Sequence, residues 1–440
     1  MSGEPLSVEA ALATVLAGIE PLADLETVAP EDALGRPLAT DLTAAISLPP
    51  WASSVMDGYA VRAADVQRAT AGQPVRLTVV GEVRAGQDPD SRVLGSTAVR
   101  IATGARIPPG ADAVVPVELT TPVDTAGSPG PRGRDAVGPL PSACLVHASV
   151  GEGNAIRPAC SDVQAGNLLA RAGDPVTPAV VALAAGVGLA GVSVRRRPVA
   201  AVLATGDEVR APGSPLGPAG IPDAIGPGIR SLVREAGGVV LDLGIVGDRP
   251  ADVEGRLRQG LARADVIVVS GGMSAGPDDA VRRAFDAIGD MHQWRVAIQP
   301  GKPFAFGRAE VEGRATPVLL FGLPGNAVSS FVTFELFVRP VLRRLAGHRR
   351  LHRLSDRAVL EEPVTKSLGR RGFEPVTPVR DGDGTPLRDG LGRVRVRPAG
   401  GKGSHGLSAL AAADALAVIP EPLELAEAGT EVELRWLDRG

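Results

Sequence analysis

Acidic side chains follow three of the apolar segments in the middle of the chain, where they could bind a metal ion or position an anion. Asp207 and Glu208 follow the first segment, Asp248 follows the second, and Asp279 ends a glycine-rich stretch after the third. Carboxylate oxygens suit Mg²⁺, a hard cation that prefers oxygen ligands. Because glycines let the backbone approach a ligand and N–H groups at a helix start favour anionic oxygens, the pattern predicts a site for a phosphorylated ligand.

Two glycine-rich loops and one lysine extend this candidate site. The loops are SGGMSAGPDD at 270–279 and GLPGNAVSS at 322–330, each at the end of an apolar segment. Lys302 lies between a glycine and a proline, which would hold its ammonium group rigidly. The candidate ligand-binding residues of the two loops are Gly271, Gly272, Ser274, Gly325 and Asn326.

The first of these loops also fits a different enzyme class. Residues 272–276 match G-x-S-x-G, the nucleophile elbow of α/β-hydrolases, with Ser274 as nucleophile and His405 later in the chain. Asp278 and Asp279 follow at the helix entrance, and two carboxylates are poor neighbours for a developing oxyanion, which disfavours a hydrolase. No G-x-G-x-x-G follows a strand and no Walker A motif occurs, so a dinucleotide site is not indicated.

The histidines offer two weaker candidates. His348 and His352 are four residues apart and could in principle bind zinc, but the arginines around them favour a solvated helix end. His405 could bind an anion together with Lys402 and Ser404, or it could lie in an ordinary glycine-rich turn.

The composition limits the possible partners. Of 46 basic residues only three are lysines, which a coding bias towards arginine would explain. The formal net charge is −4 and aromatic residues make up 3% of the chain. A nucleic-acid-binding surface needs a basic stripe and stacking rings, so we expect no nucleic-acid partner.

The sequence favours a cytoplasmic protein without a membrane span. The two cysteines are too few for a disulfide framework, and the N-terminus lacks the basic region of a secretion signal. Residues 175–194 carry no charge, but their prolines and glycines would make membrane insertion weak. We expect instead a short buried helix, with Thr177 as N-cap and Pro178 at its first position, followed by a strand at 192–194.

Apolar runs and helical patterns alternate through the centre of the chain. The runs occupy 198–206, 239–247, 264–272 and 316–325, and the helices are expected near 228–236, 251–262, 279–288 and 328–345. This pattern predicts a parallel sheet with helices on both faces. Short strand patterns at 48–147 and after about residue 354 predict two smaller β-rich units.

Together these stretches resemble the molybdopterin molybdenumtransferase family, which includes MoeA-like proteins and the E domain of gephyrin. The motifs that carry the resemblance occur in the family's order over nearly the whole chain. They are PPWASSVMDGYAVRAAD (49–65), VRIATGARIPPGADAVVPVE (99–118), TGDEV (205–209), SGGMSAGPDD (270–279), PGKPFAFG (300–307) and GLPGNAVSS (322–330).

The resemblance implies a multidomain α/β protein. The expected parts are a discontinuous elongated domain (1–47 and 148–179), an inserted β-rich domain (48–147), a doubly wound α/β molybdopterin-binding domain (180–348) and a C-terminal β-domain (354–440). It also implies a homodimer whose site lies between the α/β domain of one subunit and the inserted domain of the other. Further implied partners are the molybdopterin adenylyltransferase and apo-molybdoenzymes.

The activity implied by the resemblance is transfer of molybdate to the dithiolene of adenylylated molybdopterin, with Mg²⁺ and release of AMP. Asp57 and Thr103 would approach the site from the second subunit, and Arg157 and Asp162 match family positions. The four acidic residues at the strand ends would handle Mg²⁺ and the adenylate phosphate. Lys302 and Ser404 would hold molybdate or phosphate oxygens.

Several positions depart from the family's motifs. Gln299 replaces the first lysine of Lys-Pro-Gly-Lys-Pro. The other departures from the motifs are Ala327, Pro222-Asp223-Ala224-Ile225, Cys160-Ser161 and Pro375. These departures leave a second hypothesis, a divergent non-catalytic paralogue that binds molybdopterin or acts as a scaffold. The retained acidic residues and Lys302 favour the enzyme.

Overall fold

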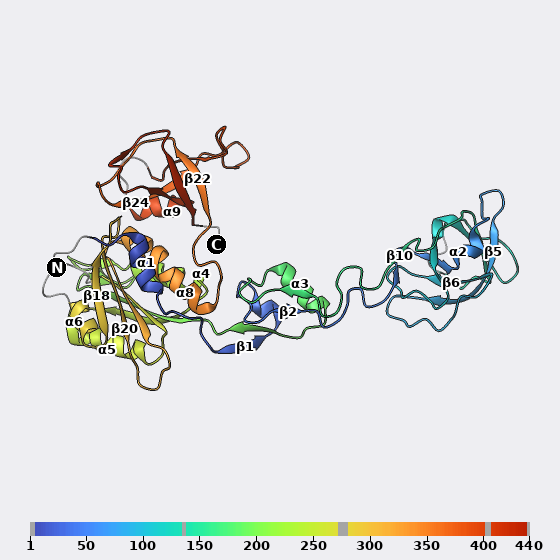
Figure 1. Ribbon diagram of the computed structural model, residues 1–440, viewed down its shortest axis with the longest axis horizontal. Helices are drawn as coiled ribbons and strands as arrows, with labels where there is room; N and C mark the ends of the chain where they lie inside the picture. The colour runs from blue at the N-terminus through green and yellow to red at the C-terminus, as the bar shows by residue number, and fades with distance from the viewer. Residues whose placement is uncertain (1–4, 134–137, 272–279, 401–405, 438–440) are drawn as a thin grey trace.

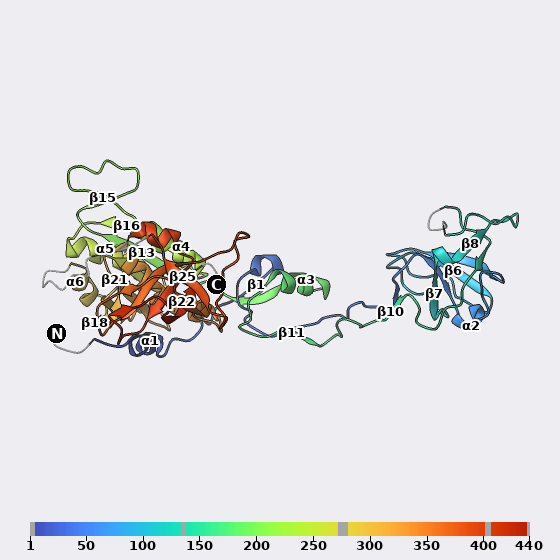
Figure 2. The same cartoon turned by 90° about the horizontal axis from the view of Figure 1, so that it is seen from above.

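The protein is elongated, with its parts arranged along one long axis (Figure 1). The computed structural model describes residues 5–133, 138–271, 280–400 and 406–437. An α/β domain and a C-terminal β-domain lie at one end, a thin arm extends from them, and an inserted β-domain forms the far end (Figures 1 and 2).

A six-stranded sheet forms the centre of the α/β domain. Its order is β16 (Val239–Val246), β13 (Val199–Thr205), β17 (Val266–Ser270), β21 (Val318–Leu323), β20 (Pro303–Ala309) and β18 (Asp290–Arg295). The first four strands are parallel, as the apolar runs predict. The last two are antiparallel additions to the sheet, and the sequence reasoning did not anticipate them.

Helices cover both faces of this sheet, as predicted. They are α4 (Ile225–Glu235), α5 (Pro250–Leu261), α6 (Ala280–Asp286) and α7 (Ala327–Thr333), which continues through the π-helical segment η3 (Phe334–Val338) into α8 (Arg339–Ala346). α4, α7 and α8 bury apolar residues against one face, and α5 and α6 against the other. The N-terminal helix α1 (Val8–Leu16) also packs on the first face, so the start of the chain belongs to the α/β core rather than to the arm.

The arm consists of two chain segments that run side by side. β1 (Leu25–Val28) pairs with β12 (Val192–Arg195), and β2 (Leu42–Thr43) pairs with β11 (Leu168–Ala170). The short helices η1 (Pro30–Ala33) and α3 (Pro178–Gly186) complete a small apolar core that includes Ala33, Val176, Ala184 and Val194. A domain boundary at 179/180 therefore falls inside α3, and the arm continues to β12.

The uncharged stretch 175–194 folds as predicted. The Thr177 hydroxyl accepts a hydrogen bond from the Val180 N–H at 3.3 Å, Pro178 begins α3, and β12 follows from residue 192. No helix among the described residues is long and apolar enough to cross a membrane.

The inserted β-domain is built on a six-stranded sheet. Its order is β7 (Ala113–Pro116), β4 (Gly58–Val61), β6 (Thr97–Ile101), β5 (Val75–Val83), β9 (Ala143–Val146) and β8 (Thr120–Val123). The two-residue strands β3 (Ser53–Ser54) and β10 (Ile156–Arg157) pair where the arm enters this domain, and α2 (Ala63–Val66) packs beside the sheet.

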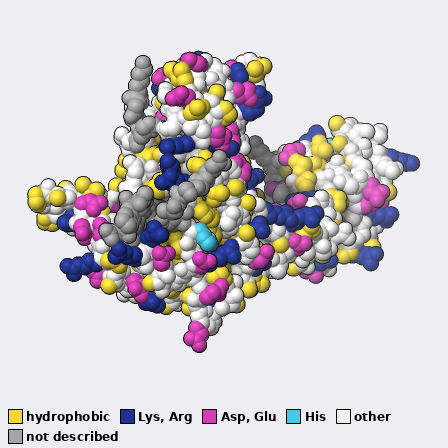
Figure 3. All heavy atoms as spheres, turned by 60° about the vertical axis from the view of Figure 1, so that its left-hand side comes forward, with side chains coloured by type: hydrophobic (Ala, Val, Ile, Leu, Met, Phe, Trp, Pro, Cys, Tyr) yellow, Lys and Arg dark blue, Asp and Glu magenta, His cyan; other side chains and the backbone are white. Residues whose placement is uncertain are grey.

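The C-terminal β-domain completes its main sheet with a strand from the α/β domain. The order is β19 (Ile298–Gln299), β24 (Arg371–Pro378), β25 (Val394–Pro398), β22 (Ser355–Leu360), β28 (Glu431–Trp436) and β26 (Ala415–Ile419). β23 (Val364–Thr365), β27 (Leu425–Ala426) and α9 (Leu407–Ala412) complete the domain. The face of the molecule in Figure 3 carries acidic and basic side chains interspersed with hydrophobic ones.

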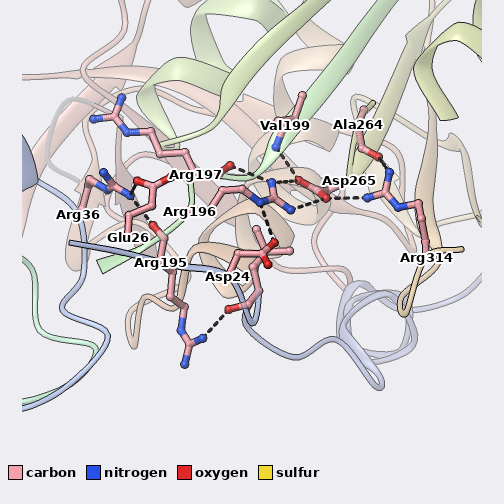
Figure 4. A network of polar contacts seen from close by, with 11 residues as sticks. Asp24, Glu26, Arg36, Arg195, Arg196, Arg197, Val199, Ala264, Asp265 and Arg314 are labelled. Atoms are coloured by element: carbon pink, nitrogen blue, oxygen red, sulfur yellow. Dashed lines mark hydrogen bonds and ion pairs between the residues drawn. The ribbon is translucent and has the colours of Figure 1, made fainter. Parts of the chain in front are cut away.

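A buried carboxylate fixes the place where the arm joins the sheet (Figure 4). Asp265, which precedes β17, is 6% exposed. It accepts two hydrogen bonds from Arg196 at 2.7 and 3.0 Å, one from Arg314 at 2.8 Å and one from the Val199 N–H at 2.8 Å. Arg196 also donates to Asp24 at 3.1 Å, at the start of the other arm segment.

The surroundings of Asp265 favour its charged form. Burial acts to raise the pKa of the Asp265 carboxyl, but the hydrogen bonds from Arg196 and the Val199 N–H and the charges of Arg196 and Arg314 lower it below its ordinary value of 3.8. Because the unfolded chain then binds this proton more tightly, the contribution to stability is present above about pH 4 and declines as pH falls through the folded pKa.

We predict that Asp265→Asn lowers the free energy of unfolding by about 3 kcal/mol at pH 7, because two arginines lose their buried counter-charge. The fall in stability below about pH 4 should also be shallower in the variant. Urea unfolding at pH 7 and between pH 3 and 5 measures both effects. Asp383→Asn, at an exposed position, is the control and should change stability by less than about 0.5 kcal/mol. An unchanged stability and pH slope in Asp265→Asn would contradict the prediction.

Candidate active site

The strand order places the predicted site residues at one edge of the α/β sheet. From β13 the chain moves to β16 on one side and then to β17 on the other, so the order reverses beside β13. Ligands in open α/β sheets bind at such a switch point, outside the carboxyl ends of the strands. Residues 205–208, 247–248, 270–271 and 324–326 follow the four parallel strands and meet at this edge. Lys302 precedes the antiparallel strand β20, whose Ala305 lies opposite Gly322 of β21, so it reaches the same edge.

Asp207 and Asp248 form the acidic centre of this edge. The Asp248 N–H donates to the Asp207 carboxylate at 3.1 Å, and the Asp207 N–H donates to the Asp248 carboxylate at 3.3 Å. A Cβ on Gly247 would lie 2.5 Å from Oδ1 of Asp207, so the Asp207 carboxylate packs closely against this glycine. Both carboxylates are exposed, which leaves oxygens available to a ligand. The structure thus brings together two of the four predicted acidic residues by direct contact.

Glu208 lies in the same loop, and its side chain folds back over that loop. Its carboxylate lies over Gly206, where an added Cβ would be 2.8 Å from Oε2. Arg210, which the sequence reasoning did not single out, donates to the Asp207 carbonyl at 2.7 Å and to the Val209 carbonyl at 3.0 Å. Arg210 lies in β14 (Val209–Arg210), which pairs with β15 (Ile221–Pro222), and it thereby fixes the acidic loop.

The floor of the site is made of closely packed backbone. Gly271 has φ +92°, and a Cβ there would lie 2.5 Å from the Thr205 carbonyl oxygen. A Cβ on Gly325 would lie 3.6 Å from Cα of Gly271, so the loops after β17 and β21 are neighbours. The Thr205 hydroxyl donates to the Ser270 carbonyl at 3.3 Å and links the ends of β13 and β17. Glycine is required at 271, because its φ is positive and the Thr205 carbonyl leaves no room for a side chain.

Asn326 and Lys302 flank helix α7. Asn326 is the N-cap of α7, and its Oδ1 accepts a hydrogen bond from the Ser329 N–H at 3.3 Å. A Cβ on Gly301 would lie 2.8 Å from Cγ2 of Thr333 in the same helix, so the loop that carries Lys302 packs on α7. Lys302 itself is half-buried.

The remaining described site residues lie far from this edge, beyond the arm (Figures 1 and 2). The Asp57 carboxylate accepts hydrogen bonds from the Thr103 N–H at 2.8 Å and from the Thr103 hydroxyl at 3.0 Å. Arg157 and Asp162 form an exposed ion pair of 3.8 Å. Within one chain, the structure does not bring these four residues to Asp207 and Asp248. Gly272, Ser274, Asp279 and Ser404 lie outside the described residues, as do Lys402 and His405.

The metal-binding capacity of the described edge rests on two carboxylates. Among the described residues, no group of three or more His, Cys, Asp or Glu side chains could hold a metal ion. Mg²⁺ in phosphate-handling sites is often held by one or two carboxylates together with substrate phosphates and water. Asp207 and Asp248 fit that smaller ligand set.

One sequence expectation changes on the structure. His348 is not part of a solvated helix end: it is 9% exposed. Burial, together with the charges of Arg343 and Arg339, lowers its pKa to about 3. Gln299, at the position of the missing lysine, accepts the Ser367 N–H on its Oε1 at 2.8 Å and so joins β19 to the C-terminal β-domain.

Comparisons with known proteins cover nearly the whole chain. Three family models match: the MoeA N-terminal region (domain I and II) at residues 6–188, a probable molybdopterin binding domain at 201–344, and the MoeA C-terminal region (domain IV) at 357–436. Molybdopterin molybdenumtransferase 2 of Mycobacterium tuberculosis is 37% identical over 93% of this chain and 94% of its own length. The chain belongs to the molybdopterin molybdenumtransferase family. The resemblance found in the sequence motifs is thereby confirmed.

Other members of the molybdopterin molybdenumtransferase family also align with nearly the whole chain. The Haemophilus influenzae enzyme is 31% identical over 92% of both chains. A solved structure of the molybdopterin biosynthesis MoeA protein of Pyrococcus horikoshii superposes with a TM-score of 0.78 at 30% identity, covering 98% of this chain and 99% of the other. The multidomain α/β fold class predicted from the sequence is confirmed.

We predict that Gly271→Ala destabilises the α/β domain by about 2 kcal/mol or more, because alanine at positive φ costs roughly 1–2 kcal/mol and its Cβ would meet the Thr205 carbonyl. The matched control is Gly255→Ala in α5, where an added Cβ meets nothing within 4 Å. This control should raise stability by up to about 1 kcal/mol. Urea unfolding of both variants measures the difference, and equal effects of the two substitutions would contradict the prediction.

Proposed function

We propose that this protein is a molybdopterin molybdenumtransferase that inserts molybdate into the dithiolene of adenylylated molybdopterin and releases AMP. The observation that carries the proposal is the sheet edge at which Asp207, Asp248 and Lys302 meet glycine-rich backbone. The names of the curated relatives, which align with this chain almost from end to end, support the same activity.

The proposed reaction depends mainly on stabilising negative charge. Cleaving the phosphoanhydride of an adenylylated substrate develops negative charge on phosphate oxygens, which cations and oriented donors stabilise. Asp207 and Asp248 would hold Mg²⁺, which when bound supplies positive charge to those oxygens. Lys302 would place its ammonium against molybdate or phosphate oxygens, and the loops around Gly271 and Gly325 would admit the ligand to the backbone. No protein nucleophile is needed.

In this proposal the working unit is a cytoplasmic homodimer with shared sites. The arm holds Asp57 and Thr103 far from Asp207 of the same chain (Figure 1). Asp57 and Thr103 can therefore serve the reaction only at the α/β domain of a second subunit. Arg157 and Asp162, at the junction of the arm and the inserted β-domain, would accompany them. Each shared site would thus be formed by the inserted β-domain of one subunit and the α/β domain of the other.

The direct test is AMP release. Purified protein with adenylylated molybdopterin, Mg²⁺ and molybdate should form AMP. Asp248→Asn should reduce the rate about a hundredfold or more, because it removes one of the two carboxylates that would hold the Mg²⁺ stabilising the developing phosphate charge. Asp383→Asn serves as the control and should keep the full rate. Absence of AMP from the unaltered protein at every molybdate concentration would contradict the proposal.

A mixed dimer tests the shared site. We expect Asp57→Asn and Asp248→Asn homodimers to be nearly inactive, whereas a heterodimer purified through two different tags keeps one intact site and should recover about half of the activity per dimer. A heterodimer as inactive as the two variant homodimers would show that Asp57 of one subunit and Asp248 of the other do not act at one shared site. A monomeric protein by size-exclusion chromatography would also contradict this part of the proposal.

A further inference from the structure

A second concentration of positive charge lies where the arm meets the α/β domain. A cavity of about 190 Å³ opens there between four segments. Its lining comes from the residues after η1, the end of β12 and the linker that follows, and the ends of α4 and α8. The charged and titratable residues in this lining are Arg36, Arg195, Arg197, Arg234, Glu235 and His348.

The charges in this cavity are unbalanced. Four arginines line it, of which Arg36 is paired with Glu26 at 2.7 Å and Arg195 donates to the Leu22 carbonyl. The one acidic residue in the lining, Glu235, is engaged elsewhere. Glu235 forms ion pairs with Arg353 at 2.5 Å and with Arg339 at 3.8 Å. The C-terminal ends of α4 and α8 add only about half a negative charge each. The cavity therefore keeps a net positive charge.

Several donors around the cavity are unused. Arg36 has a side chain only 11% exposed. Its Nη2 donates to Glu26 at 2.7 Å and to the Arg195 carbonyl at 2.5 Å, but its Nε is buried without a hydrogen-bond partner. Within the part of the chain that the structure describes, no residue pairs with the guanidinium of Arg197 or Arg234. Figure 4 shows Arg36, Arg195 and Arg197 at this joint.

His348 adds an uncharged donor. Its Nδ1 lies 3.3 Å from Nη2 of Arg343. Because arginine only donates, Nδ1 must accept, and the ring proton is then on Nε2. Nε2 lies 3.8 Å from the position of a Cβ on Gly237, at the wall of the cavity. A buried anion needs such donors to replace its hydration.

The cavity is separate from the candidate active site. α4 runs from the carboxyl end of β13 back to the start of β16, so its C-terminal end lies at the opposite edge of the sheet from Asp207. The volume far exceeds the roughly 10–15 Å³ that one water requires, so a five-atom ion has room.

We propose that this joint cavity is a binding site for a tetrahedral oxyanion, held by Arg36, Arg197, Arg234 and the Nε2–H of His348. Phosphate, sulfate and molybdate share the required charge and shape. The proposal is independent of the transferase activity, since none of these residues belongs to the sheet edge that carries Asp207 and Lys302.

Calorimetric titration of the full-length protein with sodium phosphate, sulfate and molybdate in separate experiments tests the site. We expect saturable binding of at least one of the three ions, and the Arg197→Gln/Arg234→Gln double variant should weaken it by at least about tenfold, because two charge-assisted contacts are lost. The control is Arg256→Gln/Arg263→Gln, which removes the same charge from exposed positions in and beside α5 and should leave the affinity unchanged.

Lys302→Gln separates this site from the proposed active site. Binding that persists in Lys302→Gln and is lost in Arg197→Gln/Arg234→Gln supports the joint site. Three results would overturn it: no saturable binding of any of the three ions, equal loss in the two double variants, or loss only in Lys302→Gln. Failure of AMP release has no bearing on these outcomes, so the two proposals fail independently.

Discussion

The Asp265 carboxylate is the contact on which the arrangement of the molecule depends. It holds the beginning of β13 through the Val199 N–H, the connection before β21 through Arg314, and both arm segments through Arg196, which also reaches Asp24. Isolated in the interior, such a charge would be costly, and two arginines and a backbone donor offset that cost. These contacts fix the amino end of β13 relative to the arm and to the connection that precedes β21. They lie at the opposite edge of the sheet from Asp207, Asp248 and Gly271.

The arm determines what one chain can and cannot do. Two strand pairs and a small apolar core connect the inserted β-domain to the rest of the protein, and they hold it away from the α/β domain. A chain with this shape cannot close its own Asp57 and Thr103 onto its own Asp207. The same joint that orients the arm also carries the arginine-lined cavity, so an anion bound there would touch both parts of the molecule at once.

The three lysines illustrate how composition acquires meaning only with structure. Lys302 stands at the candidate active site, but Lys366 is 5% exposed and donates to the Glu421 carbonyl at 3.1 Å within the C-terminal β-domain. A lysine in this arginine-rich chain is thus not by itself a sign of anion binding. Gln299, at the position of a missing lysine, has a local structural role, because its side chain joins two domains through a hydrogen bond.

The sequence alone determined the elements whose signals are local. Continuous apolar runs predicted the four parallel strands, and the Thr177–Pro178 pair predicted the start of α3, because burial pattern and helix capping depend on neighbouring residues. The acidic and glycine-rich strand ends predicted one ligand-binding edge, since parallel strands end together. Tertiary structure alone decided the features that depend on distant residues. β20 joins the sheet through pairing with β21 and β18 through pairing with β20. His348 is buried beside Gly237, which is distant in the chain, and the arm separates Asp57 from Asp207. Such contacts link residues far apart in the chain, and no local pattern of residue types records them.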